Sequence, residues 1–188
     1  PGNTLNAAIG QGDNEFSPLQ MAKYISMLVN GGKKIDVSIV KTIRNADGSE
    51  VSKDEINNFV NKKLGLEEET NTEDIQINQE YLNAVLQGMK SVTSDTTGTA
   101  YVRFKDFDVS VGGKTGSAEA PNDQVHAWFV GFAPFENPEI AIVVMVENGR
   151  HGNYTAEVVR DIMEEYFGMN TQDVTEDMSA TPYVEIMQ

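Results

Sequence analysis

The residues best suited to chemistry stand together in the string Lys114-Thr115-Gly116-Ser117. Lys114 supplies a fixed positive charge, and the hydroxyl group of Thr115 can hydrogen-bond a carboxylate. Gly116 has no Cβ atom, so the backbone of a ligand can lie close to the chain there. The backbone N–H group of Ser117 can stabilise an oxyanion. The string predicts a ligand-binding strand at the wall of a cleft, although the letters Lys-Thr-Gly alone also fit a glycine-flanked bulge with an exposed lysine.

A nucleophile for such a site is not evident. The sequence has no Cys, which excludes a thiolate nucleophile and Cys-zinc sites. Its single Ser-x-x-Lys match, Ser38 to Lys41, falls in a β-branched run over residues 35–43 that predicts a strand. Side chains at positions i and i+3 of a strand point to opposite faces, so Lys41 could not activate Ser38 as a base. We interpret this match as chance.

The composition is that of a globular protein. The 188 residues are 39% hydrophobic and 23% charged, and their formal net charge is -15. Such an excess of negative charge repels phosphate backbones, so no nucleic-acid partner is predicted. The two histidines, His126 and His151, have no metal-ligand spacing around them, so neither a metal nor another cofactor is predicted.

Capping residues and apolar periodicity predict the helices. Ser17 is followed at once by Pro and, three residues later, by Gln, which is a typical helix start. Asn78 is expected to cap a second helix, because apolar residues recur after it at helical spacing. Two further helices are predicted over residues 53–63 and 154–167.

Three strands are predicted over residues 109–119, 125–133 and 140–147. In the second and third strands, apolar residues occupy both alternating sets of positions, so both faces of the sheet must be covered. We expect the helices to cover them. The order helix, strand, helix, three strands, helix indicates the α+β class, with an antiparallel sheet flanked by helices.

Several unlinked strings together carry a family resemblance. They are Ala8-Ile9-Gly10-Gln11-Gly12, Ser17-Pro18-Leu19-Gln20-Met21-Ala22, Gly98-Thr99-Ala100, Lys114-Thr115-Gly116-Ser117-Ala118-Glu119, His126-Ala127-Trp128-Phe129-Val130-Gly131-Phe132-Ala133-Pro134 and Val146-Glu147-Asn148-Gly149. In order and spacing they resemble the C-terminal part of the transpeptidase domain of class B, monofunctional penicillin-binding proteins. The resemblance implies a partial β-lactamase/transpeptidase-like fold.

The resemblance also implies roles for the residues on the Lys-Thr-Gly strand. Lys114 would attract the terminal carboxylate of the donor peptide and help proton transfer, and Thr115 would bind that carboxylate. Gly116 would let the peptide lie against the strand, and Ser117 would give an oxyanion-hole N–H group. Glu119, just beyond the motif, would line the acceptor side.

The family is an acyl-serine enzyme that cross-links peptidoglycan stem peptides ending in D-Ala-D-Ala and is acylated by β-lactams. Its site needs a nucleophilic Ser with a Lys three residues on, a Ser-x-Asn triplet and the Lys-Thr-Gly strand. This sequence has no Ser-x-Asn triplet. The chain alone is therefore expected to be inactive. Alternatives are a serine β-lactamase or D,D-carboxypeptidase of the same fold, and a non-catalytic relative that only binds partners.

The expected organisation follows from the same resemblance. Residues 1–168 would be the C-terminal portion of the transpeptidase domain, with an acidic surface insertion at residues 49–78, and residues 169–188 a polar acidic tail. The chain begins at Pro1 without Met, which predicts a segment of a longer protein. The parent would lie on the extracytoplasmic face of the bacterial cell membrane, anchored by an N-terminal helix. Partners would be stem peptides, β-lactams and proteins of the wall-synthesis complex, and the segment could also self-associate.

Overall fold

The computed structural model describes residues 4–5, 15–35, 37, 40–65, 74–120, 122–150 and 152–169. Its strands are β1 (Gly112–Ala120), β2 (Gln124–Ala133) and β3 (Ile140–Val146), and they pair antiparallel in the order β1-β2-β3. Gly116 of β1 lies opposite Trp128 of β2, and Phe129 of β2 lies opposite Val144 of β3. The three predicted strands are confirmed within a few residues at each end.

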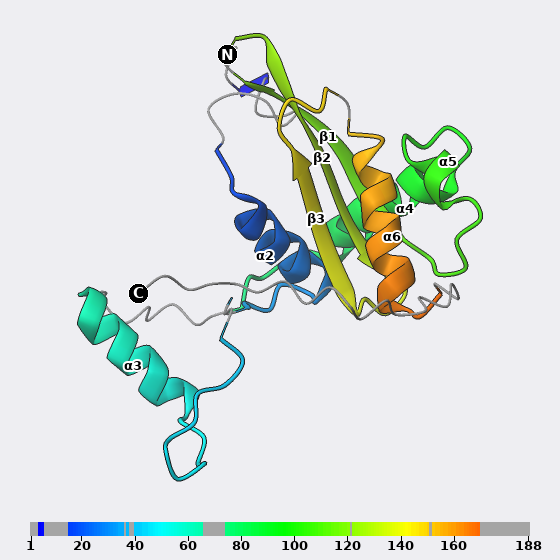
Figure 1. Ribbon diagram of the computed structural model, residues 1–188. Helices are drawn as coiled ribbons and strands as arrows, with labels where there is room; N and C mark the ends of the chain where they lie inside the picture. The colour runs from blue at the N-terminus through cyan, green and yellow to red at the C-terminus, as the bar shows by residue number, and fades with distance from the viewer. Residues whose placement is uncertain are drawn as a thin grey trace, which may run out of the picture.

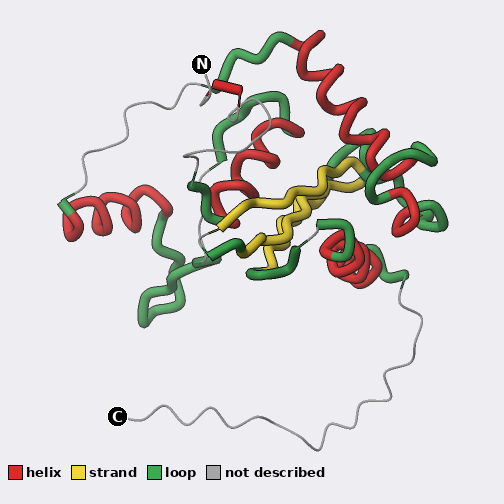
Figure 2. Tube along the Cα trace, turned by 90° about the horizontal axis from the view of Figure 1, so that it is seen from above, coloured by secondary structure: helices red, strands yellow, loops and turns green. Residues whose placement is uncertain are grey.

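Helices cover both faces of the sheet, as predicted from the two-sided apolar pattern. Helices α2 (Pro18–Val29) and α4 (Gln79–Ser94) lie on one face, and α6 (Thr155–Tyr166) lies on the other, next to the short α5 (Tyr101–Phe104) (Figures 1 and 2). Within the described residues the chain is thus a helix–sheet–helix sandwich of the α+β class. The predicted fold class is confirmed.

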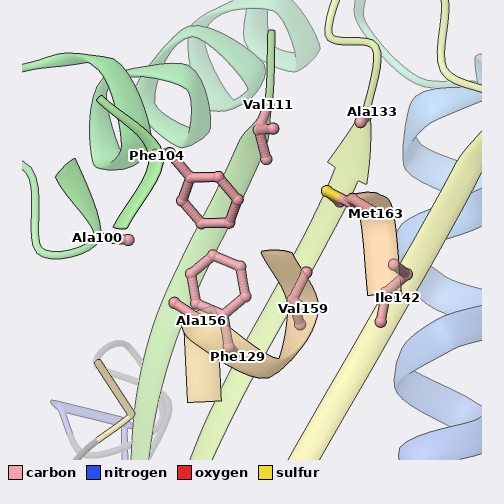
Figure 3. Close-up of a cluster of buried hydrophobic side chains, with 9 residues drawn as sticks. All are labelled: Ala100, Phe104, Val111, Phe129, Ala133, Ile142, Ala156, Val159 and Met163. Carbon is pink, nitrogen blue, oxygen red and sulfur yellow. The ribbon is translucent and has the colours of Figure 1, made fainter. Parts of the chain in front are cut away.

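The larger of the two core clusters lies between the sheet and α6. Its buried residues come from both strands and helices and are drawn in Figure 3: Ala100, Phe104, Val111, Phe129, Ala133, Ile142, Ala156, Val159 and Met163. The rings of Phe104 and Phe129 stack with centroids 5.9 Å apart. On the other face, Val130 and Phe132 pack with Ile25 of α2 and Met89 of α4. Alternate residues of β2 therefore enter opposite cores.

The helix starts follow the local signals in the sequence. The Ser17 hydroxyl accepts a hydrogen bond from the Gln20 N–H group at 3.2 Å, and the Gln20 side chain accepts one from the Ser17 N–H group at 2.8 Å. Asn78 caps α4 by accepting from the N–H groups of Glu80 and Tyr81. These bonds satisfy N–H groups that have no partner inside their helices.

The strand predicted over residues 35–43 was wrong at the described positions of that range. Residues 35, 37 and 40–43 have no strand structure, and only a single bridge joins Arg44 to Glu50 around the Asp47-Gly48 turn. A β-branched run forms a strand only where a neighbouring strand accepts its hydrogen bonds. Ser38 itself lies outside the described residues, so the strand argument against it loses its support.

The part of residues 49–78 that the structure describes includes α3 (Lys53–Leu64), which confirms the helix predicted there. No residue of α3 is buried, and Figure 1 shows it away from the sheet. The division into residues 1–168, an insertion at 49–78 and a tail at 169–188 stays a prediction. Of that tail, only Met169 is among the described residues, and the string at residues 8–12 also lies outside them.

Candidate functional site

The structure places all five predicted site residues on β1: Lys114, Thr115, Gly116, Ser117 and Glu119. Residues opposite each other in paired strands share a face of the sheet. Lys114 lies opposite Val130, on the face of α2 and α4, and Thr115 lies opposite Phe129, on the face of α6. The motif is therefore divided between the two faces of the sheet. Gly116 lies on the same face as Lys114, while Ser117 and Glu119 lie on the same face as Thr115.

The Lys114 ammonium group reaches the edge of the strand. Its Nζ atom donates a hydrogen bond of 2.7 Å to the carbonyl oxygen of Thr115, and the side chain is exposed. Only β2 pairs with β1 among the described strands. Because Lys114 and Thr115 occupy opposite faces, a ligand that contacts both must lie along the outer edge of β1. An extended peptide added at a sheet edge has this geometry.

The Thr115 hydroxyl has a partner from outside the sheet. Its Oγ1 atom lies 2.9 Å from Oγ1 of Thr99, in the turn between α4 and α5. The sequence marked residues 98–100 as a string of interest but gave no sign of this contact. No spacing rule connects residues so far apart in the chain.

Gly152, in the loop after β3, packs closely against the same strand. It is buried, and a Cβ atom built on it would clash with the carbonyl oxygens of Trp128 and Gly116. A Cβ atom built on Gly116 would itself lie 3.2 Å from Cβ of Trp128. Only a residue without a side chain fits at position 152 with β1 and β2 in this register. Sequence reasoning gave Gly152 no role.

A polar cluster fixes the chain just before β1. The Glu136 carboxylate accepts a hydrogen bond from the Lys90 ammonium at 2.9 Å and another from the Ser110 hydroxyl. The Lys90 and Ser110 bonds lower the pKa of the Glu136 carboxyl to about 2. In addition, the Thr93 hydroxyl donates to the carbonyl of Val111 at 2.5 Å. Contacts from helix α4 and from the β2–β3 connection therefore both hold in place the residues that lead into β1.

Two hollows of the described residues are not lined by Lys114. The larger, of about 220 Å³, lies between α4, α5 and the segment that leads into β1. The smaller lies between the end of α2 and the start of β3. A ligand at Lys114 would therefore lie along the strand edge and not in either of these hollows.

Two further findings concern metals and membranes. Across the described residues, no three His, Asp or Glu side chains are grouped so that they could hold a metal ion. None of the helices in the described part of the chain is long and apolar enough to cross a bilayer.

Comparison with known proteins identifies the class. The sequence profile of the penicillin binding protein transpeptidase domain matches residues 2–164. The chain belongs to this family, which confirms the resemblance inferred from the motifs. The chain spans about a quarter of the length of the curated relatives that it matches.

Individual relatives agree with this assignment. Over 189 residues the chain is 29% identical to peptidoglycan D,D-transpeptidase MrdA of Haemophilus influenzae, covering 92% of this chain and 27% of the relative. The crystal structure of Pseudomonas aeruginosa PBP2 aligns with a TM-score of 0.67 and 29% identity, covering 97% of this chain and 36% of that one. A chain from a peptidoglycan synthase complex aligns with a TM-score of 0.69 and 28% identity, covering 91% and 27%.

Proposed function

We propose that this chain forms one wall of the active site of a peptidoglycan D,D-transpeptidase, which cross-links stem peptides ending in D-Ala-D-Ala through an acyl-serine intermediate. One observation carries the proposal: the Lys114 to Ser117 string lies on β1, at the end of the strand order β1-β2-β3, in a chain of the transpeptidase family. An extended peptide can pair with a strand at the edge of a sheet through its backbone.

The proposed roles follow from the placement of each group. The Lys114 ammonium, which already lies at the strand edge, attracts the donor's terminal carboxylate and assists proton transfer beside it. The Thr115 hydroxyl hydrogen-bonds that carboxylate. Gly116 leaves room for the donor backbone, and the Ser117 N–H group stabilises the oxyanion that forms during acyl transfer. Glu119, exposed further along β1, lines the acceptor side.

The nucleophile is proposed to come from outside this sequence. Acyl transfer needs a serine activated by a neighbouring base, and the sequence has no Ser-x-Asn triplet and only the isolated Ser38 to Lys41 match. The relatives are about four times as long as the region that they share with this chain. We assign the Ser-x-x-Lys and Ser-x-Asn elements to the remainder of a longer protein, so the chain alone is inactive.

The same proposal covers location and partners. The longer protein would act at the extracytoplasmic face of the cell membrane, held by a helix outside this sequence. Its ligands would be stem peptides and β-lactams, and it would assemble with wall-synthesis proteins, as the neighbour from a peptidoglycan synthase complex suggests. The exposed Phe16, Leu19 and Tyr24 side chains of the α2 region support self-association of the isolated chain.

Labelling with a fluorescent penicillin tests the function. We expect a covalent band with the full-length protein, and a fall of about ten- to a hundredfold in its acylation rate on Lys114→Ala, because a charge-assisted hydrogen bond is lost. Lys105→Ala, which removes another exposed lysine, is the matched control and should label like the unaltered protein. An unchanged rate in Lys114→Ala would refute the role of Lys114. Rapid turnover of penicillin would instead favour the β-lactamase alternative.

A further inference from the structure

We infer that Thr99 is a positioning residue, which holds the Thr115 hydroxyl so that its proton points to a carboxylate on the ligand. The inference rests on the proposed function, in which Thr115 binds that carboxylate. It starts from the 2.9 Å contact between the two hydroxyl oxygens, in which either atom could be the donor. Thr99 would act through Thr115 without touching the ligand.

The turn that carries Thr99 is rigidly attached to α4. The Asp95 carboxylate accepts hydrogen bonds of 2.8 Å from both the N–H group and the hydroxyl of Thr97. These bonds lower the pKa of the Asp95 carboxyl. The Ala100 N–H group donates to the carbonyl of Val92 at 3.0 Å, and Ala100 is buried in the core. Thr99 therefore has a fixed backbone on its C-terminal side.

On the N-terminal side of Thr99, Gly98 lets the backbone pack closely against α4. A Cβ atom built on Gly98 would clash with the carbonyl oxygens of Ser91 and Val92 in the last turn of α4. The turn can approach the helix this closely only because residue 98 has no side chain. Thr115, for its part, is held by the pairing of β1 with β2. The two hydroxyls thus meet from two well-anchored elements.

The proton count decides what this pair can do. Each hydroxyl has one proton to donate and two lone pairs that accept. If Thr115 donated to Thr99, Thr115 would offer only lone pairs, which repel a carboxylate. If Thr99 donates to Thr115, the Thr115 proton can point to the ligand, and a hydroxyl that accepts one bond donates a stronger one. The Lys114 ammonium at the same strand edge attracts the anion that selects this second arrangement.

A double-mutant cycle in the full-length protein tests the inference. We expect Thr99→Val to lower the rate of acylation by penicillin about tenfold, and Thr99→Ser to restore it, because serine keeps the donor hydroxyl. Acylation by the methyl ester of the same penicillin, which lacks the carboxylate, should change less than about twofold. In a Thr115→Val background, Thr99→Val should have no further effect, since it acts only through Thr115.

Thr96→Val is the matched control. It removes a hydroxyl group from an exposed position of the same turn, and neither the bonds that anchor the turn nor the Thr99–Thr115 contact involves this hydroxyl, so penicillin acylation should stay close to that of the unaltered protein. Equal losses with penicillin and its ester, or a full tenfold loss from Thr99→Val in the Thr115→Val background, would overturn the inference and leave the proposed function intact. Absence of labelling in the unaltered protein would remove the proposed function, and this inference with it.

Discussion

Glu136 joins three parts of the molecule through one carboxyl group. Glu136 follows β2 in sequence. Its carboxylate accepts one hydrogen bond from the Lys90 ammonium group of α4 and another from the Ser110 hydroxyl group just before β1. The Lys90 ammonium also lies 4.5 Å from the centroid of the Phe135 ring. These contacts fix the point at which the chain enters the strand of the proposed site, although Glu136 itself is exposed.

The pKa of Glu136 gives a prediction at this scale. It is lowered from the ordinary 4.5 to about 2 in the folded chain. The ionised carboxylate therefore stabilises the fold above about pH 4.5, and this contribution disappears as the pH falls to about 2. Melting temperatures of the unaltered chain and Glu136→Gln, compared across this range, should differ at neutral pH and converge near pH 2.

Glu139→Gln is the control for this titration, because Glu139 is an exposed glutamate of the same β2–β3 connection. It should melt like the unaltered chain throughout. A difference between Glu136→Gln and the unaltered chain that stayed constant down to pH 2 would show that the Lys90 and Ser110 contacts do not lower the pKa of this carboxyl.

At the scale of elements, β1 is held by contacts from several directions. Strand β2 pairs with it along its length, α4 packs on one face, and Gly152 closes on Gly116 from the loop before α6. The Thr93 hydroxyl and the Glu136 cluster secure its start. A site that must present an ammonium group and a hydroxyl in fixed positions needs such a rigid support.

Gly152→Ala tests this support. Its methyl group would clash with backbone oxygens of Gly116 and Trp128, which cannot move aside as a flexible side chain would. We expect a loss of about 1–3 kcal/mol in the free energy of unfolding and slower acylation of the full-length protein, with Lys114 and Thr115 unchanged. Denaturant unfolding and penicillin labelling measure the two effects. Asn153→Ala, at the exposed neighbouring position, should change neither.

The sequence predicted elements whose signals are local. The caps at Ser17 and Asn78 and the three core strands could be found, because each depends on neighbouring residues or on the apolar alternation of its own strand. The strand over residues 35–43 failed because pairing depends on a distant partner. For the same reason the contacts of Thr99 with Thr115 and of Gly152 with Gly116 could not be predicted: they join residues that only the fold brings together.

At the scale of the molecule, the chain is a sheet sandwiched between helices, and its described residues give the proposed site a single wall (Figure 1). Lys114 lies on the face of α2 and α4 and reaches the edge of β1. The rest of the cleft, with the attacking serine, is assigned to a longer protein. Under this proposal, the complete active site needs residues of the longer protein.

The isolated chain of 188 residues tests this division. We expect no covalent penicillin band from the isolated chain, because the sequence has no Ser-x-Asn triplet and its single Ser-x-x-Lys match is interpreted as chance, while the full-length protein in the same gel is labelled. Far-ultraviolet circular dichroism must first show that the isolated chain is folded, since an unfolded chain would fail to label for a trivial reason. A band from the isolated chain that Ser38→Ala abolished would make Ser38 the nucleophile and would contradict both the chance interpretation of its motif and the assignment of the attacking serine to another segment.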